Sequence, residues 1–219
     1  MDAPRIRLLG DAAVVVTFGA TLSDEANDRV MQLAASLAAE PLDAAVRDVV
    51  PAIASLVVHV DPRQTSVEQV VHALQERVTA PPAVFSRPDA RLVDIQTRYG
   101  GDDGPDLADV AAFAGITPAE VIARPAARVY RVFMLGFLPG FAYLGQVDPS
   151  IAAPRRASPR QSVPAGSVGI AGRQTGVYPQ VSPGGWQLIG RTAVRMFDVA
   201  AGRALLHPGD RVRFVPERA

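Results

Sequence analysis

The sequence contains no cysteine and no lysine, so all 22 of its basic residues are arginine. The absence of cysteine excludes disulfides and thiolate chemistry. The absence of lysine excludes a Walker lysine, a Schiff base with pyridoxal phosphate, a biotinylated lysine and Ser-Lys amidase chemistry. An anionic ligand of this chain must therefore bind to arginine or to backbone amides.

The sequence also lacks an excess of charge and a long apolar run. Its 22 arginines balance 22 acidic residues, which gives no electrostatic footprint for nucleic acid. No apolar stretch is long enough to cross a bilayer. The first residues, MDAPRIRLLGDAAVVV, are a poor match to a secretory signal. We therefore expect a cytoplasmic protein that binds neither nucleic acid nor membrane.

Metal-ligating patterns are sparse as well. The chain has three histidines, and none has the spacing of HExxH or of another metal motif. Asp102, Asp103 and Asp106 cluster in a glycine-rich turn, for which we favour a solvated loop over a cation site. The sequence predicts no metal within this chain.

The N-terminal part alternates between strand and helix patterns. Residues 5–9, 12–18 and 55–61 have the β-branched and apolar composition of strands. Ser23 and Ser66 each precede an apolar stripe of helical period and are good N-caps. Burying both stripes favours a small, mostly antiparallel sheet packed against two helices.

A proline-rich stretch separates this part from the rest of the chain. We place an N-terminal α+β domain at residues 1–82, a linker at residues 83–90 and a second domain at residues 91–219. Many short strands divided by Gly and Pro turns follow the linker. This pattern favours a small β-barrel that carries minor helices.

The most informative stretch runs from Gly136 to Thr192, where Gly, Pro and Arg recur at close intervals. Proline fixes φ and removes backbone donors, whereas glycine adopts conformations closed to other residues. The spacing therefore predicts closely specified loops between short strands. Loops of this kind commonly form a binding surface.

Seven motifs extend over nearly the whole chain: GDAAVVVTFG, VPAIASLVVHVDP, YGGDDGPDL, MLGFLPGFAYLG, PRRASPRQSVPAGSVGIAGRQTGVYP, SPGGWQLIGRT and LLHPGDRVRF. On these motifs the chain resembles the family of the 5-oxoprolinase B subunit, also called allophanate hydrolase subunit 1, which includes a sporulation-kinase inhibitor. The resemblance implies an N-terminal α+β domain and a C-terminal cyclophilin-like β-barrel. That architecture agrees with the strand and helix patterns above.

The resemblance also implies an activity and partners. It implies one component of an ATP-dependent complex, formed with a C subunit and a separate A subunit, that hydrolyses 5-oxo-L-proline to L-glutamate. Because the chain has no recognisable ATP motif, we expect the ATP site to be shared between the components and this chain to be inactive alone. Its substrate would be a lactam or amide.

One departure from the family pattern concerns Pro125 and Ala126. Members of the family often have a His-Thr pair at this place, ahead of the strand that begins near Tyr130. Any chemical role of that histidine is therefore missing from this chain. No catalytic residue can be assigned from the sequence.

Arg155 and Arg160 are the first candidates for substrate binding. They follow Pro154 and Pro159, which stiffen the backbone and could hold both guanidinium groups toward one target. Arginine suits carboxylate or phosphate through bidentate hydrogen bonds and permanent charge. The alternative is that both arginines pair with acidic side chains or cap carbonyls.

Further candidates lie downstream. Ser167 could donate to a ligand oxygen, although a turn serine is the simpler interpretation. Gln174 and Tyr178 offer amide and phenol groups that could bind a lactam; the alternatives are that Gln174 caps backbone groups and that Tyr178 is a core ring with an exposed hydroxyl. Arg191 is a further candidate for substrate binding. The residues that we expect to form a pocket or interface are Phe137, Pro139, Phe141, Tyr143, Gly184, Gly185 and Trp186.

Two alternatives to the 5-oxoprolinase component stay open at this stage. The kinase-inhibitor relative suggests a binding protein that blocks a sensor histidine kinase without doing chemistry. The family relationship also allows half of a biotin-dependent urea carboxyltransferase in allophanate metabolism. That role requires a biotin carrier elsewhere, because this chain has no lysine for biotin.

Overall fold

The computed structural model describes residues 3–42, 45–78 and 90–217. The chain divides into two compact units, and the division falls within residues 79–89, which are not described. Nearly all of the linker predicted at residues 83–90 lies outside the described residues, so the domain boundaries stay a prediction. No described helix has both the length and the apolar character needed to cross a membrane.

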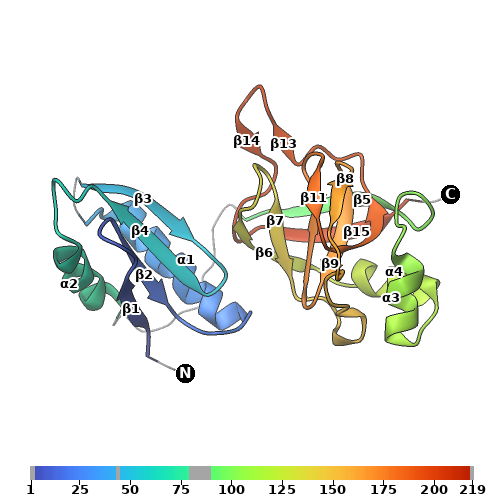
Figure 1. Ribbon diagram of the computed structural model, residues 1–219, viewed down its shortest axis with the longest axis horizontal. Helices are drawn as coiled ribbons and strands as arrows, with labels where there is room; N and C mark the ends of the chain where they lie inside the picture. Colours follow the sequence, from blue (N-terminus) through green and yellow to red (C-terminus); the bar gives the residue numbers. More distant parts are fainter. Residues whose placement is uncertain (1–2, 43–44, 79–89, 218–219) are drawn as a thin grey trace. The chain divides into compact units, whose positions relative to one another are not determined.

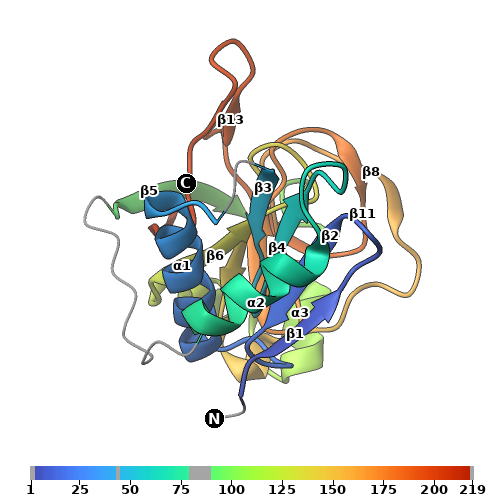
Figure 2. The same ribbon diagram turned by 90° about the vertical axis from the view of Figure 1, so that its left-hand side faces the viewer.

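The first unit is a sheet packed against two helices (Figure 2). Every neighbouring pair of strands in the sheet is antiparallel. The strand order is β1 (Arg5–Leu8), β2 (Ala13–Thr17), β4 (Ser55–Val60) and β3 (Val46–Pro51), and the helices are α1 (Asp24–Ala39) and α2 (Val67–Val78). The antiparallel sheet and its two helices confirm the predicted architecture, but the sequence analysis missed β3.

Alternation along the strands builds the core of this unit. Val14 and Val16 of β2 are fully buried, as are Leu56 and Val58 of β4. They belong to one apolar cluster with the inward stripes of α1 and α2. At the start of α1, the Ser23 hydroxyl accepts a hydrogen bond of 3.1 Å from the Ala26 amide, as its N-cap pattern predicts.

The second unit contains a closed barrel, shown on the right of Figure 1. Its strands, in order around the barrel, are β10 (Gln174–Val177), β7 (Ala142–Gly145), β6 (Tyr130–Leu135), β15 (Arg211–Pro216), β5 (Leu92–Tyr99), β12 (Gln187–Arg191) and β9 (Ser167–Ala171). The pair β15–β5 is parallel and the other pairs are antiparallel. The predicted barrel is confirmed.

Closure of the barrel depends on β15, which inserts between β5 and β6. Its Val212 and Phe214 point into the barrel core, where they join Ile95, Leu144 and Ile170. Closing the sheet removes both of its edges, which would otherwise expose unpaired backbone groups. The last strand of the chain is therefore required for the barrel to form.

Smaller elements decorate the barrel. They are α3 (Leu107–Ala114), α4 (Pro118–Ala126), the short 3-10 helix η1 (Pro149–Ile151), the strand pair β8 (Arg160–Val163) and β11 (Ser182–Gly184), and the strand pair β13 (Phe197–Asp198) and β14 (Arg203–Ala204). The hairpin β13–β14 projects from the barrel in both ribbon views (Figures 1 and 2).

Helix α4 begins at a capping box and contains a proline in its last turn. Thr117 and Glu120 form a capping box, and Pro118 occupies the first turn. Pro125 and Ala126, which replace the family's usual His-Thr pair, lie in the last turn of this helix. They are therefore part of a regular structural element.

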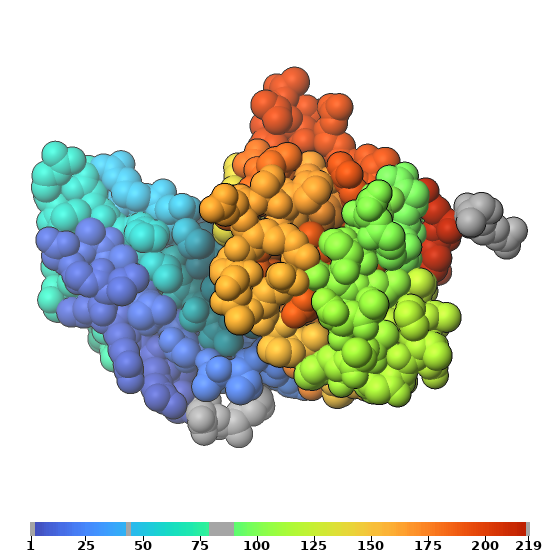
Figure 3. All heavy atoms as spheres, turned by 45° about the vertical axis from the view of Figure 1, so that its right-hand side comes forward, coloured from blue at the N-terminus to red at the C-terminus, as the bar shows by residue number. Residues whose placement is uncertain are grey.

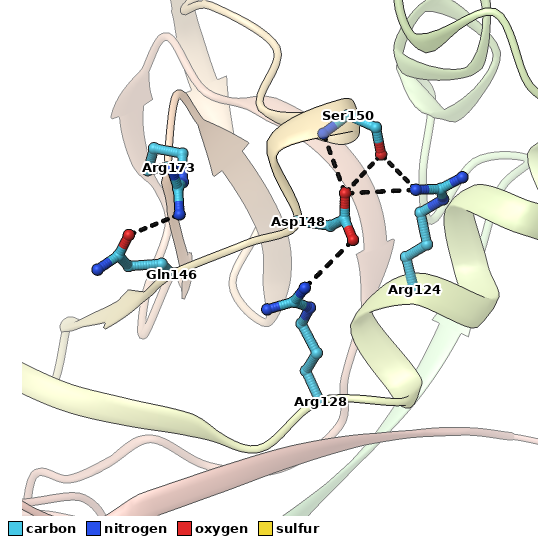
Figure 4. Close-up of polar contacts among 6 residues, drawn as sticks. All are labelled: Arg124, Arg128, Gln146, Asp148, Ser150 and Arg173. Carbon is cyan, nitrogen blue, oxygen red and sulfur yellow. Dashed lines mark hydrogen bonds and ion pairs between the residues drawn. The ribbon is translucent and has the colours of Figure 1, made fainter.

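The end of α4 is tied to η1 by the carboxylate of Asp148 (Figure 4). Asp148 Oδ1 accepts hydrogen bonds from the Ser150 hydroxyl at 2.6 Å and from the Ser150 amide at 3.0 Å. Arg124 and Arg128 donate to the same carboxylate at 3.3 and 3.2 Å. The hydrogen bonds from Ser150, followed by the two arginines, lower the pKa of Asp148 to about 2.

We expect Asp148→Asn to lower the melting temperature at neutral pH and the deficit to shrink in acid. The pKa of Asp148 falls from 3.8 in its unperturbed state to about 2 in the folded chain. The stabilisation from the ionised carboxylate is therefore complete above a pH of about 4 and is lost as the pH falls toward 2. Thermal melts across this range measure the deficit. Asp102→Asn, at an exposed position, is the control, and a deficit independent of pH contradicts the assignment.

Candidate functional site

A tight loop between β6 and β7 places two phenylalanine rings side by side. The Gly136 amide donates to the Phe141 carbonyl at 3.1 Å, and the Phe141 amide donates to the Leu138 carbonyl at 2.9 Å. Phe137 adopts a positive φ of 66°, which is uncommon for a bulky residue. The centroids of the Phe137 and Phe141 rings lie 5.5 Å apart, edge to face.

Glycine is required at position 140 of this loop. Gly140 has a φ of 84°, and a Cβ built there would lie 2.7 Å from the Phe197 Cβ and 2.8 Å from the Met196 carbonyl oxygen. The loop therefore packs directly against the start of β13. This contact explains why the motif GFLPGF needs its second glycine.

Phe141 is the centre of an aromatic cluster. Its ring makes edge-to-face contacts with Tyr143 at 4.9 Å, Tyr178 at 5.3 Å and Trp186 at 5.4 Å between centroids. Edge-to-face pairs add to the stability that burial of the rings supplies. The cluster is a second apolar core, separate from the interior of the barrel.

A pocket of about 420 Å³ opens over this cluster. Its walls are Phe137, Phe141, Tyr143, Arg155, Pro159, Tyr178, Pro183, Gly184, Gly185 and Trp186. Gly184 is needed here because a Cβ at that position would overlap the Tyr178 hydroxyl. Burial raises the pKa of Tyr143 and of Tyr178, so both phenols are neutral hydrogen-bond donors at neutral pH.

Arg155 is the one charged residue among the described residues that line the pocket. Its Cζ lies 6.0 Å from the centroid of the Trp186 ring, at the outer limit of a cation–π contact. No carboxylate lies within ion-pair distance of Arg155 in the described parts of the chain. A ligand anion could therefore bind this guanidinium without displacing an internal partner.

The segment that carries Arg155 is fixed by a buried aspartate. Asp106 is only 2% exposed, and its Oδ1 accepts from Arg156 Nη1 at 2.9 Å and from Arg160 Nη2 at 2.7 Å. Its Oδ2 accepts from the Leu188 amide at 2.7 Å. One carboxylate therefore ties residues 155–160 to β12, on the side where Trp186 lies.

These contacts correct the expectation for Asp106 and give Arg155 and Arg160 different roles. The solvated-loop interpretation is wrong for Asp106, which is a buried counterion. Arg155 and Arg160 do not converge on one target, because Arg155 lines the pocket and Arg160 binds Asp106. For Arg160 the structure shows the alternative stated above, pairing with an acidic side chain.

The other predicted substrate residues divide in the same way. Tyr178 lines the pocket, whereas Ser167, Gln174 and Arg191 are not among its walls. Ser167 is buried in β9, and its carbonyl accepts from the Tyr178 amide at 2.9 Å. Arg191 Nε donates to the Ala165 carbonyl at 2.9 Å.

Of the residues predicted to form a pocket or interface, all except Pro139 line the pocket. Sequence reasoning missed Pro159 and Pro183 as wall residues and Asp106 as the anchor. The signal for Asp106 was its place in the motif YGGDDGPDL. Among the described residues, no group of three or more His, Asp or Glu side chains is placed to hold a metal ion.

The fold and the motifs of this chain match a known family. The model of the carboxyltransferase domain, subdomain C and D, matches residues 4–206. The chain belongs to this family. It is 40% identical to the 5-oxoprolinase B subunit of Escherichia coli O157:H7, over all of this chain and 98% of that protein. It is 42% identical to the 5-oxoprolinase B subunit of Bacillus subtilis (strain 168), over 96% and 92% of the two chains.

A solved structure supports the fold of this family member. The crystal structure of TTHA0988 superimposes with a TM-score of 0.82 at 38% identity and covers 95% of this chain. The match spans only 40% of the TTHA0988 chain, so this chain corresponds to less than half of that protein. The family's α+β unit and closed barrel are thus present in both.

We expect Asp106→Asn to destabilise the barrel unit much more than Asp103→Asn. Removing one partner of a buried ion pair costs about 3–5 kcal/mol, and the partial exposure of Arg156 and Arg160 favours the lower end, near ~3 kcal/mol. Asp103 is a matched control because it pairs with Arg98 at the surface, where an ion pair contributes less than about 1 kcal/mol. Denaturant unfolding of the two variants measures the difference. Equal losses would remove Asp106 from its anchoring role.

Proposed function

We propose that this chain is the B subunit of an ATP-dependent 5-oxoprolinase, which converts 5-oxo-L-proline to L-glutamate in the cytoplasm, and that it is inactive alone. Full-length likeness to two curated 5-oxoprolinase B subunits supports the assignment. The observation that carries the substrate assignment is the aromatic pocket with a single guanidinium, that of Arg155. The C and A subunits of 5-oxoprolinase are the partners in this proposal.

The shape and chemistry of the pocket suit 5-oxoproline. The substrate is a flat lactam ring that bears one carboxylate. The pocket combines aromatic walls with the guanidinium group of Arg155, which has no ion pair among the described residues. The carboxylate would accept bidentate hydrogen bonds from Arg155. The neutral phenols of Tyr143 and Tyr178 would donate to the lactam oxygen, where negative charge develops during reaction.

The pocket lacks the groups that complete the reaction. Among the described residues that line it there is no aspartate, glutamate or histidine to act as a general base. ATP would transfer its γ-phosphoryl group to the lactam oxygen and leave as ADP. Water would add to the activated carbon, and the C–N bond would break to free the amine and leave an acyl phosphate. A second water would release phosphate to give L-glutamate. Since deprotonation of water needs a base, we place that step on a partner protein. A pocket that binds the substrate but has no general base in its described lining supports a site shared between chains, and it supports a chain that is inactive alone.

A second function draws support from the same set of lining residues. A pocket that binds a ligand but offers no base from its described walls also suits a protein that grips a segment of a sensor histidine kinase and inhibits it. The two functions differ in one measurable property. Only the 5-oxoprolinase component gives 5-oxoproline-dependent ATP hydrolysis when it is assembled with the C and A subunits.

Binding of the substrate can be followed without turnover. Trp186 is the only tryptophan of the chain and lines the pocket, so its emission reports a ligand directly. We expect 5-oxoproline to change the emission of the purified chain in a saturable way. L-proline, which has the ring and carboxylate but lacks the lactam carbonyl, is the control ligand and should bind more weakly. An unchanged emission at millimolar 5-oxoproline would argue against this pocket.

We expect Arg155→Gln to reduce kcat/KM for 5-oxoproline by about 10- to 100-fold in the assembled complex, because a hydrogen bond to a charged group contributes about 1.5–3 kcal/mol. Stability should stay near that of the parent, since Arg155 has no ion pair with the described residues. Arg173→Gln, at an exposed arginine that donates to the Gln146 side chain, is the matched control. Coupled ATPase assays at varied 5-oxoproline measure the effect.

Arg160→Gln tests the separation of the two arginines. Because Arg160 binds Asp106, its loss should lower the unfolding free energy and leave kcat/KM of the folded complex closer to the parent value than Arg155→Gln does. The opposite ranking of the two variants in kcat/KM would place Arg160 at the substrate. Hydrolysis of 5-oxoproline by the purified chain at the rate of the complex would refute the shared site.

A further inference from the structure

A second hollow lies at the root of the hairpin β13–β14, which stands out from the barrel in Figures 1 and 3. Its volume is about 300 Å³. Three arginines line it, Arg91, Arg195 and Arg203, together with His207 and Asp198. None of these residues belongs to the aromatic pocket.

The three arginines differ in whether they already bind a carboxylate of the chain. Arg91 Nη2 donates to the buried carboxylate of Asp210 at 3.1 Å and to the Leu205 carbonyl at 2.5 Å. Arg195 and Arg203 are exposed, and in the described parts of the chain neither has a carboxylate within ion-pair distance. Two guanidinium groups are thus available to an external anion.

The remaining groups do not cancel this charge. Asp198 is the only carboxylate among the described residues of the lining, and its Oδ1 already accepts from the Ala201 amide at 3.1 Å. The His207 amide donates to Asp210 Oδ2 at 2.9 Å, and the ring Nδ1 lies 3.8 Å from the same oxygen, while the ring stays exposed at the edge of the hollow. The ring can supply a further N–H to an oxyanion. The hollow therefore has more cationic donors than anionic acceptors.

We propose that this hollow binds a phosphoryl group. A guanidinium group binds two phosphate oxygens through paired hydrogen bonds. A tetrahedral phosphate presents oxygens in more directions than a planar carboxylate does, so it suits a site with several arginines. Either free phosphate or the polyphosphate of a nucleotide carries this chemistry. The proposal rests on the proposed function only for the source of the ligand, since that reaction consumes ATP.

The hollow is physically connected to the aromatic pocket. Arg195 and Asp198 flank Met196 and Phe197, which pack against Gly140. Gly140 lies in the loop whose Phe137 and Phe141 line the aromatic pocket. A phosphoryl ligand and an organic ligand would thus contact two segments that touch each other. This placement fits a reaction that joins phosphate to a small organic substrate.

Calorimetric titration of the purified full chain tests the proposal, with inorganic phosphate, pyrophosphate, ATP and adenosine as separate probes. We expect saturable 1:1 binding of pyrophosphate and ATP and none of adenosine. The double variant Arg195→Gln/Arg203→Gln should raise Kd at least about tenfold, because it removes two charged donors. Arg173→Gln should leave Kd near the parent value. Thermal melts establish that each variant is folded.

The outcomes of the titration separate the sources of the ligand. Equal affinity for pyrophosphate and ATP supports a site for the phosphoryl group alone, and tighter binding of ATP supports a nucleotide as its source. Absence of saturable binding, or an unchanged Kd in the double variant, overturns the proposal. Loss of complex assembly in the double variant with phosphate binding intact makes the hollow a contact with a partner protein and also overturns it. None of these titrations measures 5-oxoproline, so a negative result overturns the phosphoryl site without contradicting the proposed function. The proposed function is tested by the Arg155→Gln assay.

Discussion

The buried carboxylate of Asp106 is the interaction on which the arrangement of the site depends. It accepts hydrogen bonds from Arg156, Arg160 and the Leu188 amide, so it joins a loop, a strand and the start of α3 at one point. Two further hydrogen bonds hold the same segment, from the Arg156 amide to the Gly185 carbonyl at 2.8 Å and from Gln187 Nε2 to the Pro154 carbonyl at 3.0 Å. Together these contacts place Arg155 at the pocket beside Trp186. Arg156 and Arg160, which bind Asp106, thus help to position Arg155, the arginine that lines the pocket.

Much of the fold could be predicted from local pattern. The serine cap of α1, the alternating valines of β2 and β4, and the glycine-rich strands of the barrel each point to their own structure. Strand β3 could not be found in this way, because it lies at the sheet edge, exposes Arg47 and Asp48, and ends in Pro51. An edge strand forms by pairing with its neighbour, and that pairing is a tertiary contact that the local sequence does not show.

The candidate site was predictable where it depends on motif chemistry, and less so where it depends on pairing across the chain. The aromatic residues of GFLPGFAY and SPGGW come together as a pocket, since their glycines allow close approach. The partner of Arg160 lies 54 residues earlier, and nothing in the sequence between them signals the pairing. Ser167 and Gln174 were plausible donors by type, but the strands β9 and β10 that carry them do not line the aromatic pocket.

On the functions proposed above, the two hollows of the barrel unit would bind the two reactants of an ATP-dependent lactam hydrolase. One has aromatic walls and a single cation, which suits a small ring with one carboxylate. The other is lined by three arginines, of which Arg195 and Arg203 have no carboxylate within ion-pair distance among the described residues, and this suits phosphate. Among the described residues, the lining of the aromatic pocket has no carboxylate or imidazole to act as a base, whereas Asp198 and His207 lie in the other hollow. On the two functions proposed above, this chain would bind both reactants while a partner protein supplied the base, and the contact between Gly140 and Phe197 would connect the two binding sites.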